Sequence, residues 1–157
     1  MPKYTPENLL PALRLFVDAR NEAIDGGFTD NGGAIHSVER IVDILSCGLC
    51  YPHLSHINNL KSDPKAEISK AAHEARQRGE RLKIKIEHVL PQRAYARKII
   101  EIVNDRGSDE DVIRYIKENY RLVILTDEET VAINKINRSK ITKDRIADAG
   151  IELYEGL

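Results

Sequence analysis

The chain has 157 residues, with 41% apolar and 31% charged side chains and a formal net charge of −1. This composition is globular, and the length suits about one ordinary domain whose core needs neither disulfides nor a metal. It excludes a largely disordered chain, and no run approaches the roughly 18 apolar residues that a membrane-spanning helix needs.

Residues 1–7 contain no apolar segment of the kind that begins a signal peptide. We therefore expect a cytoplasmic protein without a membrane partner. Only two cysteines are present, and in a chain without an export signal they argue against a disulfide framework. The sequence predicts no particular oligomeric state.

Helical periodicity dominates the first 50 residues. A Thr-Pro start at residues 5–6 and apolar residues at helical spacing predict a helix that ends at a glycine pair, residues 26–27. The stretch 28–33, FTDNGG, is typical of a loop. Ser37 is a suitable cap for a second helix, which must stop near Pro52 because the residue before a proline disfavours helix.

A third helix is predicted from Asp63-Pro64 to about Arg78, with Gly79 ending it. The period then changes to two over residues 82–89, which predicts a strand. Lys83, Lys85 and Glu87 share one face of it, and the other face carries Leu82, Ile84, Ile86 and His88.

Helices are predicted at 92–104 and from Ser108, followed by a strand at 122–125. This strand is apolar on both faces and should be central and covered. Two further helices are expected, one at 127–135 with Thr126 as its cap and one at 142–149. Gly150 follows the last one, with Ile146 and Ile151 placed as the apolar pair of a Schellman motif.

These elements predict one α+β domain over residues 1–157, mostly helical, with a small two- to three-stranded sheet. Residues 1–80 would form a helical half, and residues 81–157 a β-α-α-β-α half.

Positive charge is concentrated in the middle of the chain. Residues 76–98 carry 8 basic and 2 acidic side chains, whereas the flanking segments are acidic. Such a centre is typical of a phosphate footprint, and Arg93, Arg97 and Lys98 are the candidate nucleic-acid contacts. The alternative is a solvated strand face beside a solvated helix face.

Four potential zinc ligands lie within ten residues: Cys47, Cys50, His53 and His56. Thiolates and imidazoles suit tetrahedral zinc, but structural sites usually combine two pairs separated by a longer loop. The alternatives are a redox pair, Cys47 with Cys50, or two buried, inert thiols followed by loop histidines. We expect the structural role, with no stoichiometric zinc.

Two stretches resemble the β-β-α core of HNH (His-Me finger) nucleases. They are Ile86-Glu-His-Val-Leu-Pro91 and Leu122-Val-Ile-Leu-Thr-Asp-Glu-Glu129. In that family the first strand ends in a metal-binding acid or histidine and the general-base histidine, and a helix after the second strand supplies another ligand. The longer stretch from Glu87 through Leu125-Thr126 to Ala149-Gly-Ile151 resembles uncharacterised bacterial and phage proteins, which implies a family but not an activity.

The resemblance implies that His88 is the base that activates a water and that Glu87 is a ligand of a divalent metal, Mg²⁺ or Zn²⁺. Asp127 and Asn134 are the candidate ligands after the second strand. The chain departs from the family at Arg121, where asparagine is usual, and at Thr130, where the helix histidine is expected. Without catalysis, His88 would be a histidine at the edge of the core.

The leading hypothesis is therefore a divergent HNH-like nucleic-acid-binding protein, a candidate metal-dependent endonuclease that hydrolyses phosphodiesters. The alternative is a non-enzymatic module that binds a partner protein, such as a regulator or inhibitor encoded by a phage or mobile element.

Overall fold

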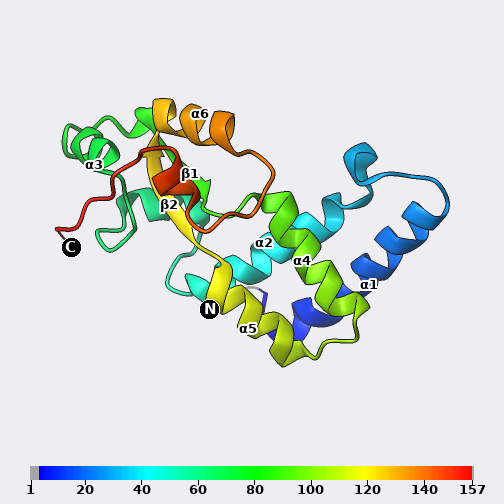
Figure 1. Cartoon of the computed structure of the whole chain (residues 1–157). Coiled ribbons are helices and arrows are strands. Elements are labelled where there is room, and N and C mark those ends of the chain that lie inside the picture. The colour runs from blue at the N-terminus through cyan, green and yellow to red at the C-terminus, as the bar shows by residue number, and fades with distance from the viewer. Residues whose placement is uncertain (1–3, 157) are drawn as a thin grey trace. The chain divides into compact units, whose positions relative to one another are not determined.

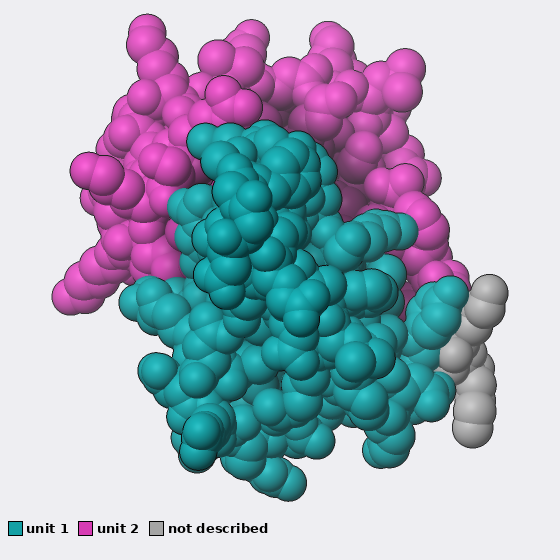
Figure 2. All heavy atoms as spheres, turned by 90° about the vertical axis from the view of Figure 1, so that its right-hand side faces the viewer, with its two compact units in different colours: residues 1–53, 95–119 teal, residues 54–94, 120–157 magenta. Residues whose placement is uncertain are grey.

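The computed structural model describes residues 4–156; the first three residues of the N-terminal stretch considered above lie outside this range. The chain forms two compact units, coloured separately in Figure 2. Unit 1 comprises residues 1–53 and 95–119, and unit 2 comprises residues 54–94 and 120–157. The units interleave along the sequence, because the chain leaves unit 1 and later returns to it. Assignment of the whole chain to one domain stays a prediction.

Unit 1 contains the helices α1 (Pro6–Asp25), α2 (His36–Cys50) and α5 (Asp109–Asn119), and α4 (Gln92–Asn104) from residue 95 onward (Figure 1). α1 and α2 are joined through η1, a short π-helical turn (Asp30–Ala34). α2 packs against both α1 and α5. The apolar faces of these helices, together with Ile35 just before α2, supply the fully buried core, which includes Leu13, Val17, Val38, Leu45, Ile99, Val112 and Ile116.

Unit 2 contains a two-stranded antiparallel sheet, β1 (Ile84–His88) with β2 (Leu122–Thr126). β2 is buried along almost its whole length, because residues 67–69 pair with its other edge. There the amide of Ile124 donates to Glu67 O (2.9 Å), and the amide of Ser69 donates to Ile124 O (3.0 Å). An isolated bridge then joins Ser69 to Leu153 near the C-terminus.

The helices of unit 2 are α3 (Lys70–Gln77), α6 (Asp127–Ile136) and the short α7 (Arg145–Asp148), with 3₁₀ turns η2 (Ile57–Ser62) and η3 (Arg81–Lys83). One face of the sheet and the helices α6 and α7 share a core of Val89, Val123, Leu125, Ile133 and Ile146. The prediction of a mostly helical α+β chain with a small sheet is confirmed.

Three predicted helix ends are confirmed in atomic detail. Thr126 and Glu129 form a reciprocal capping box at the start of α6. After α7, Gly150 takes a positive φ of 71°, and its amide donates to Ala147 O (2.9 Å). The amide of Ile151 donates to Ile146 O (3.2 Å), which completes the expected Schellman motif. Gly79, also at positive φ, follows α3 as predicted.

Several predicted boundaries were wrong. α3 begins at Lys70 rather than at Asp63, because Asp63 accepts from the amide of Lys65 in a turn and residues 67–69 pair with β2. Residues 81–83 form a 3₁₀ turn instead of strand, which leaves the side chain of Leu82 94% exposed. The last helix covers only 145–148, since Asp144 is its N-cap.

Candidate functional site

Glu87 and His88 end β1, where the resemblance to HNH nucleases places its metal ligand and base. Adjacent strand residues project to opposite faces of a sheet. Glu87 pairs with Val123 and lies on the face that α6 and α7 cover, whereas His88 pairs with Leu122 on the other face. One strand therefore directs the two side chains of the predicted site to different environments.

The centre of the Glu87 side is the guanidinium of Arg145, a residue that is only 3% exposed. Its Nη1 donates to the carbonyl of His88 (2.9 Å), and its Nη2 donates to Asn134 Oδ1 (2.6 Å). Its Nε donates to the carbonyl of Asn137 (2.7 Å), and Glu87 Oε1 lies 3.9 Å from Nη1. Oxygens from β1, α6 and the following loop thus converge on one buried cation.

Burial decides the electrostatics of this pair. It raises the pKa of the Glu87 carboxyl above its ordinary value of 4.5, although the neighbouring Arg145 acts in the opposite direction. Burial also lowers the pKa of Arg145, against the influence of Glu87. A guanidinium keeps its charge in proteins even so. The buried positive charge is therefore permanent, and its hydrogen bonds to three oxygens compensate it.

His88 makes its ring contact elsewhere. Its imidazole meets Tyr120 edge-on, with ring centroids 5.8 Å apart and planes at 73°. Tyr120 is only 8% exposed, and edge-to-face pairs of this kind stabilise packing. This geometry matches the expectation for a histidine at the edge of the core; a role as general base stays a prediction.

The remaining candidate metal ligands are arranged unequally. Asn134 shares Arg145 with Glu87, but its side-chain oxygen is the acceptor of the 2.6 Å bond. Asp127 lies in the exposed first turn of α6, 3.9 Å from Lys85 Nζ, where an acid suits the helix dipole. Among residues 4–156, no three Cys, His, Asp or Glu side chains gather as a metal-binding group.

The four residues of the Cys/His segment divide between the units. Cys47 and Cys50 lie half-buried at the end of α2 in unit 1, and Cys50 Sγ donates to Ile116 O (3.8 Å). Burial raises the pKa of both thiols, which disfavours the reactive thiolate. His56 belongs to unit 2, where its Nδ1 accepts from the amide of Asn58 (3.1 Å) as the cap of η2. His53 is exposed.

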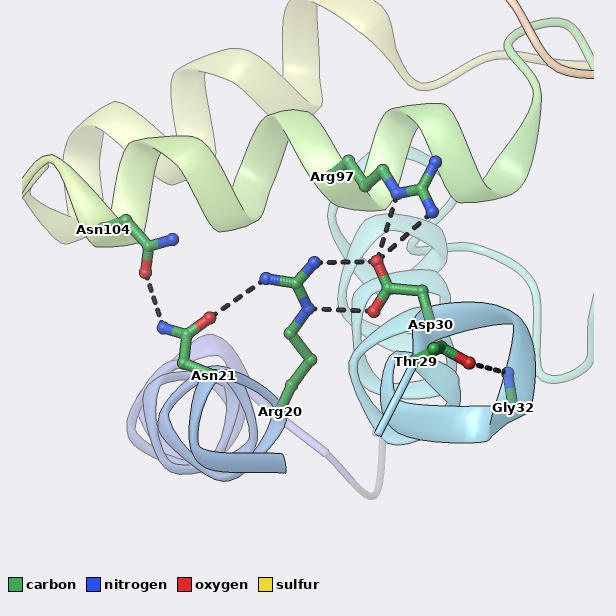
Figure 3. A network of polar contacts seen from close by, with 7 residues as sticks. All are labelled: Arg20, Asn21, Thr29, Asp30, Gly32, Arg97 and Asn104. Atoms are coloured by element: carbon green, nitrogen blue, oxygen red, sulfur yellow. Dashed lines mark hydrogen bonds and ion pairs between the residues drawn. The ribbon is translucent and has the colours of Figure 1, made fainter. Parts of the chain in front are cut away.

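Two of the three predicted phosphate contacts have acidic partners. Lys98 Nζ lies 3.4 Å from Glu101, and Arg97 is paired with Asp30 (Figure 3). Arg93 is half-buried in the first turn of α4. Pairing within the protein lowers the positive charge that residues 93–98 present to a ligand.

Asp30 is the centre of a polar network in unit 1 (Figure 3). Arg20 binds it in a bidentate manner, Nε to Oδ1 (2.9 Å) and Nη2 to Oδ2 (2.7 Å), and Arg97 Nη2 lies 3.2 Å from Oδ2. The Arg20 guanidinium, and then that of Arg97, holds the pKa of the Asp30 carboxyl below its ordinary value of 3.8. The turn that carries Asp30 is closed by Thr29, whose Oγ1 accepts from the amide of Gly32 (2.9 Å).

Sequence reasoning missed two features of unit 2. It did not assign a role to Arg145, which is isolated in the sequence from the residues that it binds. It also missed the positive charge of the loop between α6 and α7. Charge was counted over a long C-terminal segment, in which the acids of neighbouring helices outnumber the cations of the loop. Residues 135–143 contain four cations and no acid, a local signal that a shorter counting window would have detected.

Comparisons of the chain with protein-family models, with curated proteins and with solved structures gave no match. Within the described residues, no helix combines the length and apolar character needed to cross a membrane.

Proposed function

We propose that this chain is a nucleic-acid-binding protein with a degenerate HNH-like β-β-α core, and that it does not hydrolyse phosphodiesters at His88. One observation carries the proposal: the guanidinium of Arg145 lies among the oxygens that the resemblance assigns to a metal ion and its surroundings. The arrangement β1–β2–α6 supports the relationship to that core, since two antiparallel strands are followed by a helix that contacts both.

Arg145 and a divalent cation would compete for the same acceptors. Asn134 Oδ1 already accepts from Arg145, and Glu87 is its nearest carboxylate. Two unit positive charges about 4 Å apart repel by roughly 4 kcal/mol at an effective dielectric constant of about 20, and a divalent ion doubles this. Because the positive charge of the guanidinium is permanent and buried, these oxygens are better suited to Arg145 than to a metal ion.

The charge of unit 2 supports the nucleic-acid part of the proposal. Unit 2 carries 15 basic and 12 acidic side chains, whereas unit 1 carries 9 basic and 13 acidic ones. A basic surface attracts the phosphate backbone, and such binding needs no metal centre.

Binding of labelled duplex DNA in EDTA and in Mg²⁺ tests this function. We expect binding in both buffers, and an affinity that falls steeply as salt increases, because counterions are released from the phosphates. Absence of binding at low ionic strength would contradict the proposal. Binding that requires Mg²⁺ or Zn²⁺ would contradict its metal-free part.

The protein-binding alternative is favoured by a different observation. α1 leaves Leu15 69% and Phe16 41% exposed on adjacent positions, and exposed apolar patches often mark protein contacts. If duplex DNA is not bound at low salt, the next test uses the double variant Leu15→Ser, Phe16→Ser. Capture of a protein partner is then compared between this variant and the unchanged chain.

A further inference from the structure

The loop between α6 and α7, with the end of α6, carries a local excess of positive charge. Its loop cations have no acidic partners within the described residues. Residues 135–143 contain Lys135, Arg138, Lys140 and Lys143 but no acid, and all four cations are exposed. Within residues 4–156, no ion pair involves Arg138, Lys140 or Lys143. Their charge is therefore directed to solvent rather than compensated within the chain.

The neighbouring charges have separate structural roles. Lys135 lies in the last turn of α6, where a cation is stabilised by the helix dipole. Asp144, the nearest acid in the sequence, turns toward α7, because its Oδ1 accepts from the amide of Ala147 (3.0 Å). Three cations of the loop, Arg138, Lys140 and Lys143, remain without such a role.

The loop backbone is fixed at its base, although it contains neither helix nor strand. The side chain of Asn137 accepts from the amide of Lys140 (2.9 Å) and donates to the carbonyl of Lys140 (2.7 Å). The carbonyl of Asn137 also accepts from the buried Arg145, which joins the loop to β1 and α6. A loop that is ordered before binding loses less conformational entropy when a complex forms.

We propose that Arg138, Lys140 and Lys143 form a surface, here called the basic loop, that binds the phosphate backbone of duplex nucleic acid. This inference rests on the proposed function and assigns it a location. Three cations on a fixed turn can neutralise neighbouring phosphates without reading bases, so binding should depend little on sequence.

The composition of the loop favours a duplex over the other polyanions. Residues 135–143 contain no aromatic side chain, and stacking on aromatic rings is the usual means of holding single-stranded bases. Peripheral membrane binding typically uses an amphipathic helix with a broad apolar face, whereas this segment (Figure 1, orange) is non-helical over 137–144. The backbone of a duplex needs neither feature.

The test compares two triple variants with the unchanged chain. The loop variant carries Arg138→Gln, Lys140→Gln and Lys143→Gln. The control carries Arg40→Gln, Arg106→Gln and Lys117→Gln, three exposed cations of unit 1, and changes the net charge equally. Circular dichroism and thermal melts establish that both are folded, and fluorescence anisotropy measures binding of a duplex, the corresponding single strand and anionic phospholipid vesicles over a salt series.

We expect the loop variant to bind the duplex at least about tenfold more weakly, with a salt slope shallower by about 2 to 3, as the loss of three phosphate contacts predicts. The control should retain nearly the original slope.

If the unchanged chain binds DNA and both variants lose affinity equally, the basic loop is not the binding surface, although the proposed function stands. Stronger binding to vesicles or to single strands than to the duplex would also overturn this inference. If the unchanged chain binds no nucleic acid, the proposed function itself fails.

Discussion

Arg145 joins three segments of unit 2, of which β1 is distant from it in the sequence. Its guanidinium binds the end of β1 through the His88 carbonyl, α6 through Asn134, and the loop through the Asn137 carbonyl. The planar fork of an arginine can direct donors to several acceptors at once, which a lysine cannot. We interpret Arg145 as the cation that organises the oxygens of this region.

Removing this charge should destabilise the fold severely. In Arg145→Met, Glu87 would remain partly buried without its cation and two carbonyls would lose their donor, so we expect a loss of about 3–5 kcal/mol in unfolding free energy. Urea unfolding measures it. Arg138→Met, an exposed arginine of the same loop, is the matched control and should cost less than about 0.5 kcal/mol. Equal effects of the two substitutions would refute the organising role of Arg145.

Glu87 should make stability depend on pH. Since burial raises its pKa above 4.5 in the folded chain, its favourable contribution is present below 4.5 and is lost as pH rises through the folded pKa. The unfolding free energy of Glu87→Gln relative to that of the unchanged chain should therefore increase as pH rises from acidic to neutral. Unfolding free energies of both proteins across this range test the trend, and NMR should show a Glu87 carboxyl midpoint above 4.5. A midpoint below 4.5 would contradict the account.

At the scale of elements, the ion pairs of Asp30 connect its turn to α1 and α4 within unit 1. The Asp30 side chain is only 9% exposed and that of Arg20 17%, so solvent screens this pair far less than a surface pair. A comparison is available in the same unit: Arg14 and Asp109 form an ion pair of the same chemical type, with side chains 35% and 50% exposed.

Asp30→Asn should lower the unfolding free energy by about 1.5–3 kcal/mol, as expected for a lost hydrogen-bonded charge pair. Asp109→Asn should cost only about 0–1 kcal/mol, because its pair is exposed. The guanidinium groups lower the pKa of Asp30 below 3.8. The difference between Asp30→Asn and the unchanged chain should thus be complete above pH 3.8 and disappear as pH falls through the folded pKa. Denaturant titrations at several pH values measure both effects.

The elements that sequence predicted well are those with local signals. The capping residues Thr126 and Ser108, the positive-φ glycines and the apolar run of β2 depend on neighbours a few residues away. The start of α3 was wrong because it depends on β2: residues 67–69 use their backbone groups in a sheet contact more than 50 positions along the chain. A local Asp-Pro signal could not reveal that competition.

The candidate site was harder to predict for the same reason. The sequence identified Glu87, His88 and Asn134, and the structure brings Glu87 and Asn134 to one guanidinium. Arg145 lies 57 residues after His88, in a segment that gave no catalytic or metal signal. The opposite faces of Glu87 and His88 follow from strand geometry alone, and the sequence analysis predicted them correctly.

At the scale of the whole molecule, charge separates between the two units as well as along the chain. The net charge of −1 conceals an acidic unit 1 and a basic unit 2. The predicted positive centre at 76–98 contributes residues to both units, and several of them are paired with acids. A polyanion should therefore be attracted by the unpaired cations of unit 2 rather than by the segment as a whole.

The central claim, binding of nucleic acid without cleavage at His88, is tested most directly by incubating supercoiled plasmid with the purified chain. Mg²⁺, Mn²⁺ or Zn²⁺ is added, and half of each reaction is analysed for complex formation and half, after protease treatment, for nicking. We predict a mobility shift with no nicking above the protein-free control, and the same result for His88→Ala. A positioned general base contributes about 10²–10⁴-fold to rate. Nicking by the unchanged chain that a folded His88→Ala variant loses by such a factor would contradict the account.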